Sequence, residues 1–362
     1  MNEKAGIRAE AERLFAAFQA VGALPVDADI LLPAETLLDL YGEDIRARAY
    51  MTTDPLQGEM MLRPDFTVPV VQQHMAYGAD PARYCYMGKV FRSRETLGLR
   101  KNEYLQVGFE VFDRNAPEQA DAEVFALFAK LLGGTVARPV TGDIGILMAA
   151  VRGLDTSERR KAALLRHIWR PRRFRALLDR FAGRAAIPKA RAELLERLAT
   201  GSAADLMKAA GPFIGLRGPD EVATRVAALI EDADAPPIAA PEAALLYDLL
   251  SLQAPAEAAL AHLRGITFLM SAITPAVDRF AARLVALRSR GIDTATLPFE
   301  ASLGRTSMEY YDGFTFSFLA KGFDPVASGG RYDALTAVLG LGRSIPAVGG
   351  VILPALALQV RA

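Results

Sequence analysis

The stretch FRSRETLGLRKNEYLQVGFEVF (residues 91–112) contains two segments with the alternation of β-strands, separated by a loop rich in Arg and Glu. Successive side chains of a strand point to opposite faces of its sheet. In the second segment this places apolar side chains on one face, at Leu105, Val107, Phe109 and Val111. The other face presents Gln106, Gly108 and Glu110. That polar face is either an ordinary solvated surface or the floor of a polar pocket, and the alternation alone allows both.

The preceding segment, RYCYMGKVFR (83–92), predicts an antiparallel partner for this strand. Its alternation places Gly88 and Arg92 on one face. Because Gly88 and Gly108 remove side chains from the middle of the surface, we expect a small ligand to lie against the backbone there. Arg92 offers a bidentate donor for a carboxylate or phosphate, and Glu110 offers an acceptor for a cation or an N–H group.

The chain has 362 residues, enough for roughly two domains of about 150 residues each. A hydrophobic content of 51% and a charged content of 23% are typical of a folded protein with a sizeable core. Because 42 basic and 42 acidic side chains cancel, no overall field attracts nucleic acid or an anionic membrane. The single cysteine, Cys85, excludes an internal disulfide and a multi-cysteine metal site, and is typical of a reducing compartment.

The first residues, MNEKAGIRAEAERLFAAF, form an amphipathic charged segment without the apolar core of a signal peptide. No run approaches the ~18 apolar residues that a membrane-spanning helix requires. The three histidines, His74, His167 and His262, fit no metal-binding or catalytic spacing, and the chain contains no P-loop. We therefore expect a cytoplasmic protein without membrane contact, metal or cofactor.

Helix and strand patterns mix in residues 1–153 and return in residues 265–362. Between them, residues 154–264 consist of helical blocks rich in Ala, Leu and Arg, without strand patterns. We therefore predict an α+β fold, in which an antiparallel sheet flanked by helices is built from both ends of the chain. The middle segment, 154–264, is predicted to be an all-helical insertion.

Two further segments carry candidate ligand contacts. In LRPDFTVPV (62–70), prolines bracket Asp65 and Thr67, which share a face if the segment is extended. This pair could bind an ammonium group. The more common role of such residues is a turn in which the Asp side chain makes a local hydrogen bond. In EYYDGFTFSF (309–318), Tyr310 and Tyr311 either pack in the core or offer hydroxyl groups to a ligand.

The segment 166–175, RHIWRPRRFR, gathers five arginines with Trp169 and Phe174. Such a cluster contacts phosphate or RNA in some proteins, and is a solvated helix face or a subunit contact in others. The zero net charge of the chain favours the second interpretation.

Taken in order, these segments resemble the class II aminoacyl-tRNA synthetases, specifically their histidyl branch. Residues 91–112 resemble class II motif 2, and IPAVGGVILPAL (345–356) lies where motif 3 is expected. LRPDFT, EYYDGFTF and SGGRYDAL are similar to histidyl signatures. The resemblance covers about residues 1–150 and 290–358, and implies the antiparallel sheet of the class II catalytic domain.

Departures from the synthetase pattern bear on activity. Leu356 stands where motif 3 of an active synthetase has an ATP-binding arginine, and Thr306 stands where the histidyl signature has its arginine, with Arg305 one position away. The motif 2 loop also lacks the usual acid after Ser93, and six residues after Leu356 leave no room for an anticodon-binding domain. We therefore expect a protein that is not an enzyme. The pattern resembles a synthetase-like family, the regulatory subunits of ATP phosphoribosyltransferase in histidine biosynthesis.

This resemblance implies a partner, the short-form catalytic subunit, which the regulatory subunit activates within a hetero-oligomer. It also implies a homodimer inside that assembly, no role for nucleic acid, and histidine as the allosteric feedback signal. By position, Asp65, Thr67 and Gln106 would hold the α-ammonium group, and Arg92 and Gln106 lie near the carboxylate. Glu110, Tyr310 and Tyr311 would hold the imidazole ring.

Two alternatives remain open. One is a catalytically active synthetase-like enzyme that activates histidine or a related amino acid with ATP. The other is an RNA-binding module that uses the arginines of 166–175. Histidine-dependent ATP–pyrophosphate exchange would identify the first, and strongly salt-dependent RNA binding would identify the second.

Overall fold

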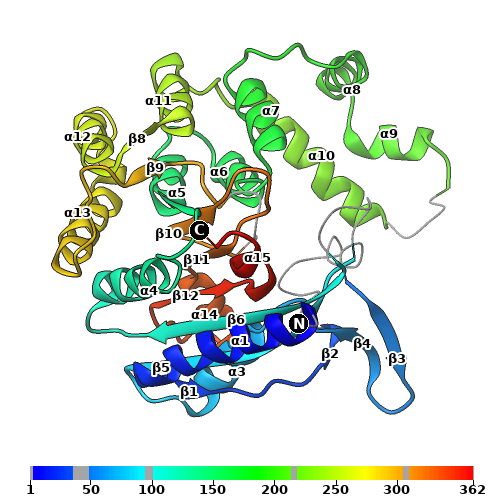
Figure 1. The fold of residues 1–362 in the computed structure, drawn as a ribbon. Helices are drawn as coiled ribbons and strands as arrows, with labels where there is room; N and C mark the ends of the chain where they lie inside the picture. The colour runs from blue at the N-terminus through cyan, green and yellow to red at the C-terminus, as the bar shows by residue number, and fades with distance from the viewer. Residues whose placement is uncertain (1–2, 36–48, 94–100, 213–217, 305–309, 362) are drawn as a thin grey trace.

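The computed structural model describes residues 3–35, 49–93, 101–212, 218–304 and 310–361. Its central feature is a sheet with nine strands in this described part of the chain (Figure 1). In spatial order they are β1 (Leu24–Pro25), β5 (Ala82–Phe91), β6 (Glu103–Phe112), β12 (Ala347–Ile352), β11 (Ala327–Arg331), β10 (Phe314–Leu319), β7 (Arg138–Asp143), β9 (Pro298–Glu300) and β8 (Gln253–Pro255). Strands from both ends of the chain therefore lie side by side.

Antiparallel pairing dominates the sheet, and β1–β5 and β7–β9 are the parallel pairs among the described strands. The predicted pairing within residues 83–112 is confirmed, with Gly88 opposite Gln106 and Tyr86 opposite Gly108. On its other edge β6 pairs with β12, which places Gly349 opposite Glu110. The predicted α+β fold with a mainly antiparallel sheet is thus confirmed.

The other elements outside residues 154–264 flank this sheet. The helices are α1 (Glu3–Ala20), α3 (Thr67–Tyr77), α4 (Pro117–Leu131), α5 (Ile144–Arg152), η2 (Ser271–Ile273), α13 (Thr274–Ser289), α14 (Asp333–Leu339) and α15 (Pro354–Gln359). A separate three-stranded sheet has the order β2 (Leu31–Pro33), β4 (Gly58–Leu62) and β3 (Met51–Asp54). Its β3–β4 hairpin extends to the side of the molecule in Figure 1.

The two faces of β6 contact different helices. On the apolar face, Phe109 stacks on Phe18 of α1 with ring centroids 5.3 Å apart, and Phe128 of α4 lies 5.6 Å from Phe18. On the polar face, Phe112 stacks on His74 of α3 at 3.9 Å. The alternation in the sequence therefore separates the layer of α1 and α4 from the face that carries α3.

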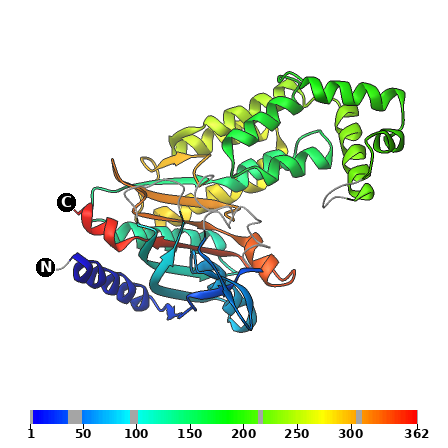
Figure 2. The same cartoon turned by 90° about the vertical axis from the view of Figure 1, so that its right-hand side faces the viewer.

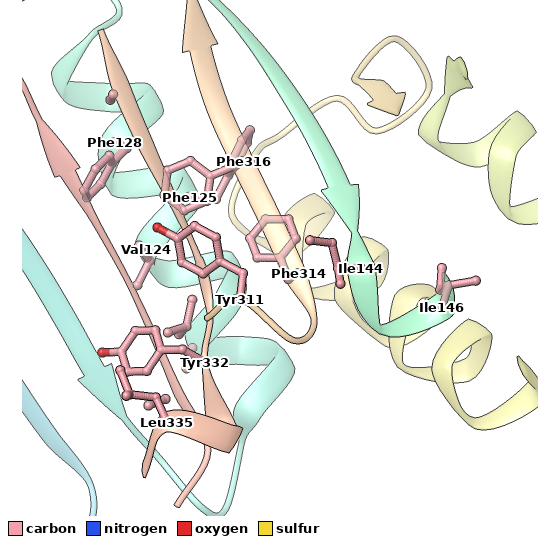
Figure 3. Packing of buried hydrophobic residues seen from close by; sticks show 14 of the residues in the cluster. Val124, Phe125, Phe128, Ile144, Ile146, Tyr311, Phe314, Phe316, Tyr332 and Leu335 are labelled. Carbon is pink, nitrogen blue, oxygen red and sulfur yellow. The ribbon is translucent and has the colours of Figure 1, made fainter. Parts of the chain in front are cut away.

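The core under β10 comes from one face of that strand. Phe314, Phe316 and Phe318 alternate along β10 and are all buried. They pack against Phe125 and Phe128 of α4, with Phe125 and Phe316 centroids 5.7 Å apart (Figure 3). Burial of each ring stabilises the fold by about 1.5–3 kcal/mol. This packing holds β10, and the segment before it, against the N-terminal half of the chain.

The segment 154–264 is mostly helical, as predicted, but it is not free of strands. Its helices are α6 (Glu158–Arg166), α7 (Pro171–Phe181), α8 (Lys189–Thr200), α9 (Ala203–Ala209), α10 (Pro219–Asp234) and α11 (Ala240–Ser251). A further helix, α12 (Ala256–Thr267), begins in this segment and ends three residues after it. The prediction of an all-helical insertion is wrong at β8, which pairs with β9 at the edge of the main sheet. A three-residue strand is too short to show periodicity, and Pro255 is tolerated because the strand is an edge.

Helices α8, α9 and α10 contain no fully buried residue among those described, and they extend away from the sheet (Figure 2). Helices α11 and α12, by contrast, pack against α5 and α13. We propose to retain the division into 1–153 with 265–362 and the insertion 154–264, in which α8–α10 form the projecting part.

The segment 62–70 is not extended beyond Phe66, because α3 begins at Thr67. Pro69 is the third residue of this helix. Proline is tolerated in a first helical turn because its missing N–H would have no partner within the helix. Asp65 and Thr67 therefore do not share one face of an extended segment, and their positions are set by the start of α3.

Candidate functional site

A cavity of about 320 Å³ lies on the polar face of the main sheet. All seven residues predicted from the sequence line it: Asp65, Thr67, Arg92, Gln106, Glu110, Tyr310 and Tyr311. They come from the start of α3, the two strands β5 and β6 with their connection, and the segment before β10. The fold therefore brings together residues that are separated by more than half of the chain.

Glu110 lies on the floor of this cavity and is only 1% exposed. Its Oε1 accepts hydrogen bonds from Tyr86 Oη at 3.0 Å and Thr67 Oγ1 at 3.2 Å. Its Oε2 accepts one from Tyr332 Oη at 2.6 Å. Burial raises the pKa of Glu110 to about 7, although the three hydroxyl donors favour the ionised form and oppose this shift. The carboxyl group thus changes charge near neutral pH.

The raised pKa makes stability depend on pH. In the unfolded chain Glu110 titrates near its ordinary value of 4.5, and in the folded protein it titrates near 7. The stabilising contribution of a group with a raised pKa is fully present below the unfolded value and is lost as the pH rises through the folded value. We therefore expect Glu110 to lower the free energy of unfolding progressively between about pH 4.5 and pH 7.

Urea unfolding of the wild type and Glu110→Gln at pH values across this window measures the effect. The pH dependence should be weaker in Glu110→Gln, because the amide does not titrate. Asp312, whose pKa burial also raises to about 7, titrates in both proteins and cancels in the comparison. Equal pH dependence in the two proteins would show that Glu110 is ionised in the fold at a normal pKa.

The glycines of the pocket floor have a different role from the one predicted. A Cβ on Gly108 would clash with the ring of Tyr86, and a Cβ on Gly88 would lie 2.6 Å from Phe66 Cζ. The expectation that Gly88 and Gly108 expose backbone to a ligand is therefore wrong, because aromatic side chains of the protein fill that space. Gly349 makes room for the carboxylate of Glu110 in the same way.

Tyr310 and Tyr311 combine the two roles that the sequence left open. Tyr311 is 5% exposed and packs beside Gly330, yet it also lines the cavity. Burial raises its pKa, so its hydroxyl remains a hydrogen-bond donor. Tyr310 Oη donates to Thr67 Oγ1 at 3.2 Å. Figure 3 shows the hydroxyl groups of Tyr311 and Tyr332 directed to the same side of the sheet.

Gln106 is 3% exposed and also belongs to the pocket floor. Its Oε1 is buried and has no hydrogen-bond partner in the described part of the chain. A buried polar atom without a partner costs about 1–3 kcal/mol. This oxygen is therefore an acceptor available to a ligand with an N–H or O–H group.

Arg92 and Asp65 complete the cavity wall. Arg92 Nε donates to the carbonyl oxygen of Pro64 at 2.8 Å, which holds the segment before α3 against the end of β5. Asp65, next to Pro64, is 4% exposed. Arg92 therefore positions this segment and places positive charge at the cavity.

Tyr332, which lines the cavity, and Tyr86, which lies beneath it, both donate to Glu110 but were not predicted as site residues. Tyr86 lies two residues before Gly88 on the same face of β5, so the alternation could have identified it. Tyr332 belongs to SGGRYDAL and precedes α14. No pattern in the sequence places it beside Glu110, because that contact joins β6 to the segment after β11.

The departures from the synthetase pattern are only partly within the described residues. Arg305 and Thr306 lie outside them. Leu356 lies on α15, where its side chain packs on the hydrophobic core. No cluster of three or more potential metal ligands occurs among the described residues. Within the same residues, no helix is long and apolar enough to cross a membrane.

Comparisons with known proteins agree with this geometry. The family model for histidyl-tRNA synthetase matches residues 2–254 and 220–354. Solved structures of similar fold include an ATP phosphoribosyltransferase regulatory subunit/histidyl-tRNA synthetase from Bacillus halodurans, with a TM-score of 0.68 and 19% identity over 99% of this chain and 80% of that chain. Histidyl-tRNA synthetase from Nostoc has a TM-score of 0.64 and 15% identity, covering 99% and 72%.

Curated relatives are more similar in sequence. The ATP phosphoribosyltransferase regulatory subunit of Allorhizobium ampelinum is 32% identical over 347 residues, which cover 92% of each chain. That of Mesorhizobium japonicum is 32% identical over 343 residues, which cover 90% of each chain. The chain belongs to the family of ATP phosphoribosyltransferase regulatory subunits, which has the fold of histidyl-tRNA synthetase.

Proposed function

We propose that this chain is the regulatory subunit of an ATP phosphoribosyltransferase in histidine biosynthesis, and that its cavity binds free histidine. Its partner is a short-form catalytic subunit, which it activates by assembly, and the chain itself is not the catalyst. Bound histidine is the feedback signal. Such coupling requires histidine to favour a less active arrangement of the complex, by about 1–3 kcal/mol in typical allosteric systems.

The unpartnered Oε1 of Gln106 is the observation that carries this proposal. It lies in the cavity with Asp65 and Thr67, so the cavity contains oxygen acceptors from three side chains for an α-ammonium group, which has three donors. Arg92 provides positive charge for the α-carboxylate. A cavity of about 320 Å³ is at the small end of ligand pockets, as expected for an amino acid.

The environment of Glu110 supports an imidazole ligand. A carboxylate has about four acceptor positions, and the three hydroxyl donors leave one position on Oε2. An imidazole N–H can donate there, while Tyr310 and Tyr311 lie beside the ring. An analogue without that N–H would leave a buried acceptor unpaired, which is the basis of strong discrimination.

The remaining parts of the proposal concern assembly and location. We infer a homodimer within the hetero-oligomer, in the cytoplasm, without a role for nucleic acid. The family to which the chain belongs supports the presence of a catalytic partner.

Two measurements on the purified wild type test this function. Calorimetry should detect saturable histidine binding with one site per chain. ATP–pyrophosphate exchange should show no histidine-dependent activity, since Leu356 stands where a synthetase has its ATP-binding arginine. Robust exchange would replace the regulatory function with that of an amino-acid-activating enzyme, and an absence of histidine binding would remove histidine as the ligand.

A further inference from the structure

A block of positive charge lies in the helical insertion, although the chain as a whole has no net charge. Residues 159–178 contain eight Arg or Lys and no Asp or Glu. Within this block, Arg159 and Arg160 are neutralised by α10: Arg159 Nε lies 2.8 Å from Glu231, and Arg160 Nε lies 2.7 Å from Asp232. These two arginines therefore stabilise the packing of α6 on α10.

Four other arginines of the block are arranged differently. Arg166 at the end of α6, and Arg172, Arg173 and Arg175 on α7, are all exposed. None of these four has an ion pair in the part of the chain that the structure describes. We call them the arginine face. Asp179, the acid on α7, accepts a hydrogen bond from Tyr247 at 2.5 Å and forms no ion pair with these arginines among the described residues. The face therefore keeps its charge, and such a patch steers association with a surface of opposite sign.

The pattern of α7 directs these side chains outward. Phe174, Leu178 and Phe181 are the buried residues of this helix. At 100° per residue, Arg172 lies opposite that buried stripe, and Arg173 and Arg175 lie on its two sides. The helix therefore uses its apolar face for packing, and its exposed arginines lie on the rest of its circumference.

The aromatic residues of the block favour a protein partner over RNA. Single-stranded RNA is bound by aromatic rings that stack on bases. Here Phe174 is fully buried, and Trp169 packs on the hydrophobic core with its indole Nε1 donating to the carbonyl oxygen of Tyr311 at 3.1 Å. Neither ring is presented for stacking, so the arginine face offers charge without base contacts.

The same hydrogen bond connects the arginine face to the cavity. Trp169 lies between α6 and α7, at the start of the helix that carries three of the four arginines. Its acceptor, Tyr311, lines the candidate histidine pocket. A displacement of Tyr311 by a ligand would therefore act directly on the segment that positions the arginine face.

We propose that the arginine face is a docking surface for an acidic surface of the catalytic subunit. This proposal rests on the proposed function, because that function supplies the partner. Docking on this face would also place the partner on the element that contacts the wall of the histidine pocket, which gives bound histidine a short route to the complex.

Charge reversal tests the proposal in the intact chain. The variant Arg172→Glu/Arg173→Glu/Arg175→Glu is compared with Arg264→Glu/Arg279→Glu/Lys321→Glu, which makes the same charge change at exposed positions of α12, α13 and the loop after β10. Affinity for the short-form catalytic subunit of the same organism is measured by sedimentation at low and high salt. Histidine calorimetry on each variant checks that the pocket is intact.

We expect the α7 variant to bind the catalytic subunit at least about tenfold more weakly, with a smaller salt dependence, and the control to bind like the wild type. Histidine binding should be unchanged in both. Wild-type affinity in the α7 variant would overturn the proposal. Binding to a labelled RNA of about 20 nucleotides is measured as well. If the α7 variant loses RNA binding but keeps its affinity for the catalytic subunit, the proposal is also overturned.

Other outcomes are also distinguishable. If the wild type itself fails to bind the catalytic subunit, the proposed function fails, and the docking surface fails with it. If the glutamate variant loses histidine binding through misfolding, Arg172→Gln/Arg175→Gln provides the test. It removes charge without reversing it, and should weaken the complex by a smaller factor; unchanged affinity in this properly folded variant would overturn the proposal.

Discussion

Glu110→Ala is expected to weaken histidine binding by about a hundredfold or more, which corresponds to ~2.7 kcal/mol or above. The substitution removes the acceptor of the imidazole N–H. It also leaves the hydroxyl groups of Thr67, Tyr86 and Tyr332 without their common acceptor. Each buried donor without a partner costs about 1–3 kcal/mol, so the pocket should lose its arrangement as well as one contact.

Calorimetry on matched variants separates these contributions. Glu110→Gln keeps an acceptor oxygen and should retain more affinity than Glu110→Ala. Ser328→Ala changes another lining residue of the same cavity that is not among the proposed contacts, and should bind histidine within about threefold of the wild type. Equal affinity of Glu110→Ala and the wild type would remove Glu110 from the binding site.

Arg283→Met is expected to destabilise the folded protein by about 3–5 kcal/mol, the range for removing one partner of a buried ion pair. Arg283 lies on α13 and is 2% exposed. Its Nε donates to Asp121 of α4 and its Nη1 to Asp143 at the end of β7, each at 2.8 Å. Asp121 also accepts from Arg331 at 2.7 Å. Without Arg283, the carboxylate of Asp143 would be buried without its cation.

Urea unfolding measures this effect, and Arg279→Met is the matched control. Arg279 is an exposed residue of the same helix, so its replacement should change the free energy of unfolding by less than about 0.5 kcal/mol. A loss below about 1 kcal/mol in Arg283→Met would contradict the prediction and would mean that this buried ion pair contributes little to the free energy of unfolding.

Buried ion pairs among Asp121, Asp143, Arg283 and Arg331, here called the Arg283 cluster, also join the two ends of the chain in one domain. Asp121 and Asp143 come from the N-terminal part, and Arg283 and Arg331 come from the C-terminal part. Asp312 and Asp333, which adjoin this cluster, directly follow the cavity residues Tyr311 and Tyr332. The buried charges therefore lie next to the pocket and hold its two tyrosine segments against α4.

The sequence by itself determined the pairing of β5 with β6, the separation of their two faces, and the seven cavity residues. Alternation is sufficient for the faces because a strand has a period of two residues. The motif resemblance was needed for the residues distant in sequence, since no local pattern relates position 65 to position 311. Both the alternation and the motifs can be recognised within a short segment of the chain.

Only the tertiary structure decided what occupies the space beside the glycines. Gly88 and Gly108 appear as openings in the sequence, yet Phe66 and Tyr86 fill those openings. The reason is that a glycine removes its own side chain but does not specify which neighbour enters the space; strand register and packing from other segments do. The burial that raises the pKa of Glu110, and the three hydroxyl donors that oppose this rise, follow from contacts between segments up to 222 residues apart.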